Sequence, residues 1–167
     1  MYKELILKPA TITDGEILFQ WCNDPETRKA SHDTNEINWT DHLIWLNQTL
    51  KNPDRQLFIV WEKTKDPTNS LSYIVSIIRP VGTVRIDHDK LEDTYELSWT
   101  VAPEARGRGI GKRIVKIITN QMRDKNIKAE IRPDNKASIK IAEFAGLKLN
   151  YALDEISFYF RDGKLND

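Results

Sequence analysis

The chain has 167 residues, of which 40% are apolar, so it is long enough for one compact domain with its own core. Lysine and arginine together number 25, as do aspartate and glutamate, and this balance excludes a general attraction to nucleic acid or to an anionic membrane surface. Cys22 is the only cysteine, which excludes an internal disulfide framework and a cysteine-cluster metal site.

Hydropathy and histidine spacing point to neither a membrane nor a metal. Residues 1–8 mix charged and apolar side chains, unlike a secretory signal, and no apolar run approaches the length that spans a bilayer. His32, His42 and His88 lack the spacing of metal ligands. We therefore expect a soluble cytoplasmic protein without a membrane or nucleic-acid partner and without a bound metal ion.

The first half of the sequence predicts a strand, two helices and then a series of strands. Residues 4–8 have a strand pattern, and Thr13 with Glu16 has the spacing of a capping box for a helix that extends through Trp21. Thr40 is the expected cap of a second helix. The segments that follow are rich in β-branched and aromatic residues and predict a meander with strands at 56–61, 72–78, 81–86 and 95–101.

The second half changes to alternating helices and strands. Residues 63–70 are charged and polar and predict a surface loop inside the meander. Beyond Pro103, isoleucines recur at helical spacing from Ile110 onward. The remaining predicted elements are a strand at 128–131, a helix that buries Ile141, Phe144 and Ala145 and stops at Gly146, and strands at 147–151 and 156–161. The order predicts a mixed α and β fold with a mostly antiparallel sheet.

A glycine-rich turn joins the strand that ends at Val101 to the following helix. Three alternating glycines allow the backbone to approach a ligand without obstruction by Cβ atoms. The start of a helix adds unpaired N–H groups and a partial positive charge, which favour a phosphate or pyrophosphate. The residues expected to hold this anion are Arg106, Gly107, Arg108, Gly109, Ile110, Gly111 and Lys112.

Rossmann and P-loop sequences also place glycines before a helix, but this turn differs from both. It lacks a Gly-Lys-Ser/Thr ending, and it lies late in a chain whose earlier strands look antiparallel. Residues 106–111 instead resemble the motif Arg/Gln-x-x-Gly-x-Gly/Ala of the GNAT superfamily, and residues 135–147 resemble its second signature. The resemblance covers nearly the whole chain.

The resemblance implies the GNAT fold, with a splayed, mostly antiparallel sheet of about six or seven strands flanked by about four helices. It also implies acetyl-CoA as the co-substrate. In that family the strand before the loop separates from its neighbour and the pantetheine arm enters the gap, where Val101 occupies the corresponding position. Asn135 and Ser138 would contact the coenzyme by the same resemblance, although Asn135 suits a helix cap equally well.

The amino-terminal half supplies the candidate acceptor residues, which are Trp21, Asn23, Arg28, His42, Trp45 and Arg85. In this half the chain looks like sugar-amine acetyltransferases of nonulosonic (pseudaminic) acid pathways, and it also resembles ribosomal-protein N-terminal acetyltransferases. The tryptophans would stack on a sugar or base, and the arginines would meet a nucleotide diphosphate. The alternative is structural, with the tryptophans in the core and the arginines in ion pairs.

The reaction that we expect is direct transfer of an acetyl group from acetyl-CoA to a primary amine, without an acyl-enzyme. At pH 7 only about one alkyl amine in a thousand is neutral, because the pKa of such an amine is about 10.4. Glu96 is the expected general base, and Ser98 on the same strand face would position a water. Glu96 has an alternative interpretation as a solvated strand-end carboxylate.

The second signature departs from the family at one position. The family usually has a tyrosine that protonates the leaving thiolate, and alignment on Asn135 and Gly146 places Ala142 there. A thiol with a pKa of about 8.5 needs little help to take a proton near neutral pH. We expect water, Ser138 or Tyr151 to supply it.

One expected function and three alternatives are considered at this point. The expected acceptor is a primary amine of a small molecule, including a nucleotide-linked amino sugar, and the first alternative is a protein N-terminus or lysine. A second alternative is a domain that senses acetyl-CoA without transferring its acetyl group. A third is an interaction module whose loop has lost its ligand, but the intact residues 106–112 argue against it. We expect either a monomer or a homodimer.

Overall fold

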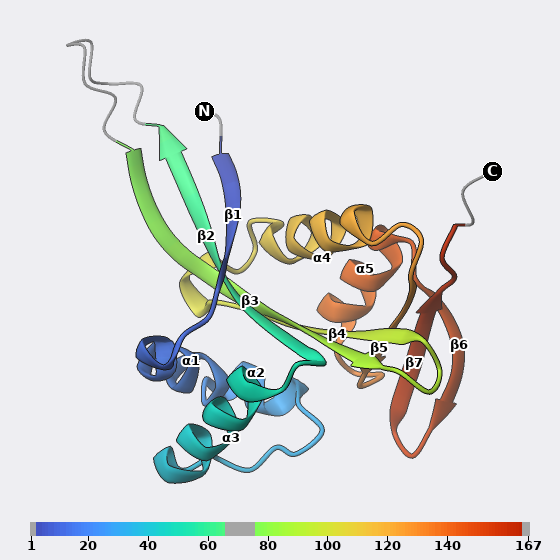
Figure 1. The fold of residues 1–167 in the computed structure, drawn as a ribbon, viewed down its shortest axis with the longest axis horizontal. Coiled ribbons are helices and arrows are strands. Elements are labelled where there is room, and N and C mark those ends of the chain that lie inside the picture. Colours follow the sequence, from blue (N-terminus) through green and yellow to red (C-terminus); the bar gives the residue numbers. More distant parts are fainter. Residues whose placement is uncertain (1–2, 66–75, 165–167) are drawn as a thin grey trace.

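The computed structural model describes residues 3–65 and 76–164, whose strands form one sheet in the order β1-β2-β3-β4-β5-β7-β6 (Figure 1). The strands are β1 (Lys3–Pro9), β2 (Arg55–Lys65), β3 (Ser76–Asp89), β4 (Thr94–Val101), β5 (Asn126–Ile131), β6 (Lys148–Leu153) and β7 (Ile156–Arg161). The helices are α1 (Gly15–Cys22), α2 (Pro25–Ala30), α3 (Trp39–Lys51), α4 (Ile110–Gln121) and α5 (Lys136–Ala145), with short 3₁₀ turns at Ile12–Asp14 and Pro103–Ala105.

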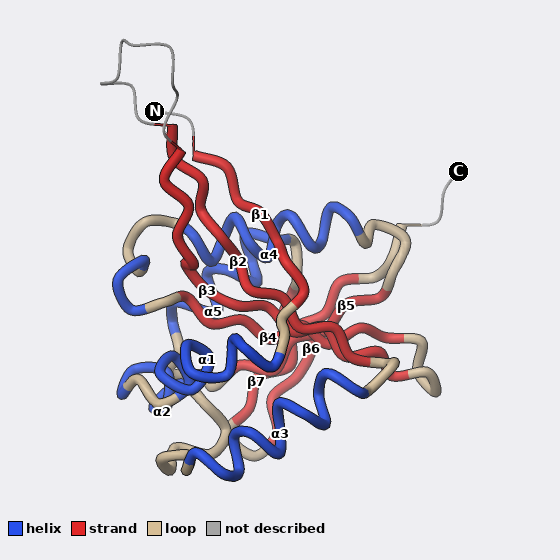
Figure 2. The backbone as a smooth tube through the Cα atoms, turned by 60° about the vertical axis from the view of Figure 1, so that its left-hand side comes forward, coloured by secondary structure: helices blue, strands red, loops and turns tan. Residues whose placement is uncertain are grey.

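The predicted fold class is confirmed. Every neighbouring pair of strands among the described residues is antiparallel except β4 and β5, which are parallel. Helices α1, α2 and α3 gather on one side of the twisted sheet, while α4 lies on the opposite side and packs against α5 (Figures 1 and 2). The described helices number five, and α2 is the one that the sequence did not predict.

The amino-terminal helix begins differently from the prediction. Thr11 and Asp14, rather than Thr13 and Glu16, form the capping box, and the Asp14 carboxylate accepts a hydrogen bond from the Thr11 backbone N–H at 2.7 Å. The box therefore starts a 3₁₀ turn, and α1 follows it. Both pairs have the same sequence spacing of three, so spacing alone did not distinguish them.

Helix α3 also begins earlier than predicted. Asn38, rather than Thr40, is its N-cap, because the Asn38 side chain accepts the backbone N–H of Asp41 at 2.9 Å. Trp39 is then the first helical residue, and its ring packs edge-on against Phe19 at 5.1 Å between ring centroids. This contact joins α3 to α1.

Strand β3 continues without a break where the sequence predicted two strands, at 72–78 and 81–86. Pro80 lies inside it, opposite Trp61, and the register of β2 against β3 shifts at that point. Such an irregularity accommodates a residue that cannot donate a ladder hydrogen bond. Residues 72–75 of the first predicted strand lie outside the described residues.

The loop predicted at 63–70 is only partly described. Residues 63–65 continue β2, which contradicts the prediction for them, and the others lie outside the described residues. Strand β2 is longer than predicted because its last residues pair with the start of β3.

Helices α4 and α5 pack closely through small side chains. The buried face of α4 follows the predicted isoleucine spacing, with Ile110 and Ile114 fully enclosed. In α5 the predicted burial of Ala145 is confirmed and Ile141 is partly buried, but Phe144 is 54% exposed, which contradicts the prediction for it. Ala142 completes the buried face. Small residues on this face allow the two helices to approach each other.

Candidate functional site

Strands β4 and β5 are paired over only the first part of β4. The parallel pairing joins residues 94–96 to residues 126–128, whereas β4 continues to Val101 with β3 as its partner on the other side. Residues 97–101 line a cleft of about 870 Å³. Backbone groups without a strand partner on this side can hydrogen-bond to an extended ligand that lies along β4.

The loop between β4 and α4 forms one end of the cleft. Gly107 and Gly109 both have φ of +72°, a region that residues with a Cβ rarely adopt. Gly111 has a different role, because a Cβ on it would lie 2.5 Å from Cδ1 of Ile141 and would separate α4 from α5. Within the described chain the earliest backbone bond of α4 runs from the Arg113 N–H to the Gly109 carbonyl at 3.3 Å. The N–H groups of residues 110–112 therefore remain available to an anion.

The two arginines of the loop are both paired with protein carboxylates, and only Arg106 also lines the cleft. Arg106 donates to the carboxylate of Asp24 and to Oγ1 of Thr27, the latter at 3.0 Å. Arg108 donates to the carboxylate of Glu62 and does not line the cleft. Both side chains are thus paired with protein carboxylates. Arg108 therefore does not face the cleft, whereas the backbone N–H groups at the start of α4 have no partner within the helix.

Asp24 connects the loop to α2, which the sequence analysis missed. Its carboxylate accepts the Thr27 N–H at 3.0 Å and caps α2, while Pro25 takes the first helical position. Burial raises the pKa of Asp24, but hydrogen bonds from Arg106 and Thr27 outweigh it, so the net shift is downward. An aspartate followed by a proline is a recognised start of a helix, so this signal was present in the sequence.

Lysines supply positive charge along the cleft. Lys112, Lys136 and Lys140 line it, and the sequence had assigned only the first of them. The ammonium of Lys112 lies 5.1 Å from the centre of the Phe144 ring, which places a cation–π contact next to the loop. Lys136 and Lys140 are four residues apart, the helical spacing that puts them on one face of α5.

Asn135 is confirmed as a helix cap. Its side-chain oxygen accepts the Ser138 N–H at 3.0 Å at the start of α5. Both residues also line the cleft, so contact with a ligand remains open to them. The capping bond uses the amide oxygen and leaves the amide nitrogen for a ligand.

Glu96 lies where β4 separates from β5. Its carboxylate is 3.2 Å from the ammonium of Lys128, which also lies 3.7 Å from Glu130. Burial lowers the pKa of Lys128, but the hydrogen bond with Glu96 and the two negative charges outweigh it, so the net shift is upward. Lys128 is therefore cationic at neutral pH. Glu96 lines the cleft, as does Ser98 two residues further along β4.

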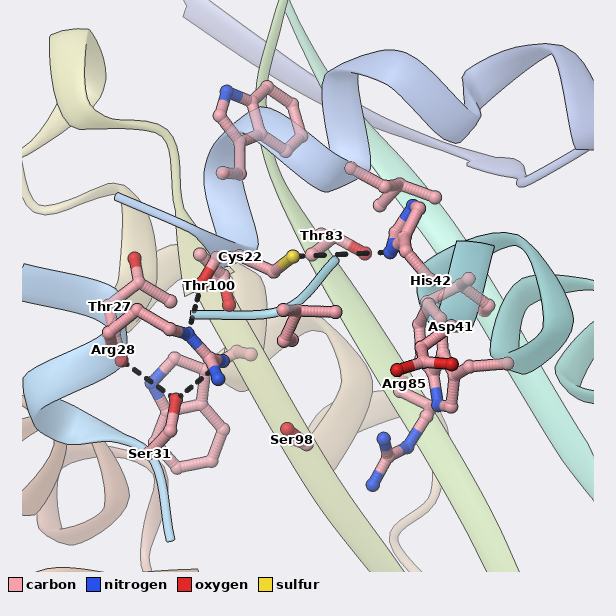
Figure 3. A pocket seen from close by; sticks show the side chains of 16 residues that line it. Cys22, Thr27, Arg28, Ser31, Asp41, His42, Thr83, Arg85, Ser98 and Thr100 are labelled. Carbon is pink, nitrogen blue, oxygen red and sulfur yellow. Dashed lines mark hydrogen bonds between the residues drawn. The ribbon is translucent and has the colours of Figure 1, made fainter. Parts of the chain in front are cut away.

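A second cavity, of about 420 Å³, lies beside the cleft (Figure 3). Its aromatic lining includes Trp21, Trp45 and Trp99, and the sequence had predicted the first two as acceptor residues. Trp21 is only 4% exposed and belongs to the core, as its structural alternative expected, whereas Trp45 and Trp99 are partly buried. The cleft and the cavity share lining residues, which are Thr27, Ser31, Arg85, Ser98, Trp99 and Thr100. A ligand that extends along β4 in the cleft would therefore end next to the second cavity.

His42 and Cys22 face each other in the wall of this cavity (Figure 3). The Cys22 sulfur is 4.0 Å from Nδ1 of His42, and Nε2 of His42 lies 2.9 Å from the Gly15 carbonyl. Burial lowers the pKa of His42, against the smaller effect of the Gly15 hydrogen bond. Burial also raises the pKa of Cys22. Both groups are consequently neutral at pH 7, and His42 serves as a packed wall residue.

Arg28 is fully engaged with the protein and is not available to a diphosphate. Its Nε donates to the Cys22 carbonyl, and one terminal nitrogen donates to the carbonyls of Asp33 and Asn35, both at 3.2 Å. The other terminal nitrogen donates to Oγ of Ser31 at 3.0 Å. Arg28 therefore has a structural role, but through carbonyl and hydroxyl oxygens rather than through the ion pair that the alternative expected.

Asn23 holds the same segment from its other end. Its amide donates to the Ile37 carbonyl at 2.7 Å and accepts the Ile37 N–H at 2.9 Å. It does not line either cavity, which contradicts the predicted acceptor role. Asn23 and Arg28 together shape the segment that forms one side of the second cavity.

Arg85, a predicted acceptor residue, has terminal nitrogens that remain available to hydrogen-bond a ligand. It lines both cavities, and its Nε donates to the Asp87 carboxylate at 2.7 Å. Asp87 also accepts from Arg55. The two terminal nitrogens of Arg85 have no hydrogen-bond partner among residues 3–65 and 76–164.

Tyr151 is not brought into the site. It lies on the edge strand β6, stacks on Phe158 at 4.5 Å between ring centroids, and lines neither cavity. Ala142, where a family tyrosine was expected, is fully buried between packed elements. Of the two expected side-chain proton sources, Ser138 lines the cleft and Tyr151 does not.

The described part of the chain has neither a cluster of metal-ligand side chains nor a membrane-spanning helix. No three side chains of His, Cys, Asp or Glu gather there in a way that would hold a metal ion. None of its helices is both long and apolar enough to span a membrane.

Known proteins share this architecture. Residues 4–148 match the family model described as the acetyltransferase (GNAT) domain. The structure of a domain from Methanocaldococcus jannaschii has a TM-score of 0.78 at 22% identity, covering 96% of this chain and 99% of that one. The complex of the aminoglycoside acetyltransferase AAC(6')-Ib with coenzyme A has a TM-score of 0.72 at 14% identity, covering 95% of each chain.

A third similar structure is RimL, a ribosomal L7/L12 α-N-protein acetyltransferase in complex with coenzyme A. Its TM-score is 0.70 at 12% identity, and the match covers 95% of this chain and 94% of that one. At these identities the likeness establishes the fold. Among proteins with curated descriptions, none matches the sequence.

Proposed function

The chain belongs to the GNAT acetyltransferase family, and we propose that it transfers an acetyl group from acetyl-CoA to a primary amine of a small molecule. The observation that carries this proposal is the junction of the two cavities. An anion-binding loop lies at one end of the cleft, and the other part of the cleft meets an aromatic cavity at residues 98–100 of β4. Two ligands can therefore meet end to end.

The cleft suits coenzyme A in two respects. The free N–H groups of residues 110–112 suit its pyrophosphate, and each such charge-assisted hydrogen bond contributes about 1.5 to 3 kcal/mol. Residues 97–101 offer unpaired backbone groups to the amides of the pantetheine arm. This placement would bring the thioester close to Ser98.

The acetyl group would pass directly to the amine. The nitrogen lone pair attacks the thioester carbonyl carbon, the ammonium proton passes to Glu96 directly or through a water on Ser98, and the C–S bond then breaks. The thiolate takes a proton from water or from Ser138. Lys128 lies 3.2 Å from the Glu96 carboxylate and holds it at the point where β4 separates from β5.

The lining of the second cavity supports an acceptor with a flat face and a negative charge. Tryptophan rings stack on sugars and bases, and the terminal nitrogens of Arg85 suit a phosphate or carboxylate. A nucleotide-linked amino sugar has both features. A protein N-terminus is the second candidate, because one similar structure is a ribosomal-protein acetyltransferase.

Release of free thiol from acetyl-CoA distinguishes these acceptors. The panel consists of nucleotide-linked amino sugars, free amino sugars, peptides with a free N-terminus and polyamines, with an acceptor-free blank. We expect the nucleotide-linked sugars to give the highest kcat/KM. Arg85→Met should raise KM for them without raising KM for the free amino sugars, which carry no phosphate. Highest activity on peptides would replace the small-molecule acceptor with a protein. Coenzyme binding without thiol release from any acceptor would support the sensor alternative.

A further inference from the structure

Glu62 is a fully buried carboxylate that lies behind the coenzyme loop. Its side chain is 0% exposed and accepts from Arg79 on the neighbouring strand, with contacts at 3.0 and 3.3 Å. Arg108 of the loop donates to the same carboxylate oxygen. Arg113, in the first turn of α4, has a terminal nitrogen 3.9 Å from the other oxygen. One buried charge thus joins β2, β3, the loop and α4.

Charge neutralisation of Glu62 does not by itself explain why three arginines lie around one carboxylate. A buried carboxylate needs a hydrogen-bonded cation, and Arg79, directly opposite in the β2–β3 register, already supplies one. Arg108 lies 46 residues after Glu62 in the chain and supplies a second hydrogen-bonded cation. The sheet therefore has a fixed anchor for a segment that is distant in sequence.

The position of Arg108 means that its contact with Glu62 restricts the backbone of the loop. It lies between Gly107 and Gly109, both of which have positive φ and no Cβ to restrict them. A Gly-Arg-Gly turn without an anchor would sample many backbone conformations, and a ligand would have to order it on binding. Arg113 adds a longer contact, 3.9 Å, between the same carboxylate and the first turn of α4.

We propose that Glu62 is a positioning residue for the coenzyme, which acts through Arg108 and Arg113 to hold the loop and the start of α4 in the binding conformation. The inference rests on the proposed function, in which this loop binds the pyrophosphate of coenzyme A. Arg108 is then an anchor and not a phosphate ligand. Glu62 itself lies outside the cleft and touches no substrate.

Calorimetric titration with coenzyme A tests the proposal without an acceptor. We expect Arg108→Met and Glu62→Gln each to weaken binding by about tenfold to a hundredfold, which converts to about 1.4 to 2.8 kcal/mol. The double variant should bind no more weakly than the weaker single variant, because both changes remove the same anchor. Arg79→Met is the matched control, since it contacts the same carboxylate from outside the loop, and we expect it to change affinity by less than about threefold.

Turnover separates positioning from chemistry. With the best acceptor, Arg108→Met should raise KM for acetyl-CoA while kcat at saturation stays within about twofold of wild type. Arg108→Lys, which keeps a cation for Glu62, should recover part of the lost affinity.

Several results would overturn the proposal. If a folded Arg108→Met protein binds coenzyme A as tightly as wild type, Arg108 does not anchor the loop. This variant decides the question even where Glu62→Gln fails to fold. Fully additive losses in the double variant would make Arg108 a direct phosphate ligand. Failure of the wild-type protein to bind coenzyme A would instead overturn the proposed function, and that outcome is recognised before any variant is made.

Discussion

Replacement of Gly109 by glutamate separates the ligand role of the loop from its structural role. Gly109 has φ of +72° and ψ of 11°, and a Cβ at this position would meet no atom within 4 Å. The cost to the fold is therefore limited to left-handed strain, about 1 to 2 kcal/mol. For a chain of this size that cost lowers Tm by about 2 to 8 °C.

The effect on the ligand is larger because the new carboxylate lies at the N-terminus of α4. It competes with the pyrophosphate for the N–H groups of residues 110–112 and repels its charge. Loss of two charge-assisted hydrogen bonds, about 3 to 6 kcal/mol, weakens coenzyme binding by about a hundredfold to ten-thousandfold. Gly109→Asn is the matched control, since asparagine tolerates the left-handed region and adds no charge.

The assay is calorimetric titration with coenzyme A, together with thermal unfolding of each variant. We expect Gly109→Asn to lose about tenfold or less and Gly109→Glu to show no measurable binding while it remains folded at 25 °C. A folded Gly109→Glu protein with wild-type affinity would show that the pyrophosphate binds elsewhere.

Three other changes give distinct outcomes. Glu96→Gln should lower kcat far more than coenzyme affinity, with a smaller loss as pH rises and neutral amine becomes abundant; a uniform loss of affinity at every pH would make Glu96 structural. Because burial lowers the pKa of His42, the unfolded chain takes up a proton below about pH 6.5 that the folded chain does not take up. The free energy of unfolding therefore decreases as the pH is lowered below that value. His42→Gln should flatten this part of the curve in thermal unfolding, and an unchanged slope would contradict a neutral buried histidine. Tyr151→Phe should leave kcat within about twofold, whereas a loss near a thousandfold would make Tyr151 the general acid despite its place on β6.

The elements of the fold were predictable where the signal is local. The isoleucine spacing of α4 and the left-handed glycine that stops α5 depend on nearby residues alone, and both predictions are confirmed. The unbroken course of β3 through Pro80 depends on a register shift between β2 and β3, which is a property of the pairing and not of a local pattern in β3. The exposed Phe144 likewise depends on how closely α4 approaches α5.

The site was predictable in its backbone and not in its long side chains. The glycines of the loop marked the turn that precedes α4, where Gly107 and Gly109 adopt positive φ. Arg106, Arg108 and Arg28 have long side chains that turn toward whichever acceptors folding brings near. No local pattern marks Glu62 as such an acceptor, because its partners come from three separate elements. One sequence therefore shows that the arginines are present but not which groups they contact.

Amine-dependent release of coenzyme A thiol from acetyl-CoA tests the proposed activity most directly. With wild-type protein and a nucleotide-linked amino sugar, we expect thiol release that requires the amine and rises with pH as the amine deprotonates, and a protein mass that is unchanged after incubation with acetyl-CoA alone. Tight binding of acetyl-CoA without thiol release for any primary amine, or an acetyl group bound covalently to the protein, would contradict direct transfer.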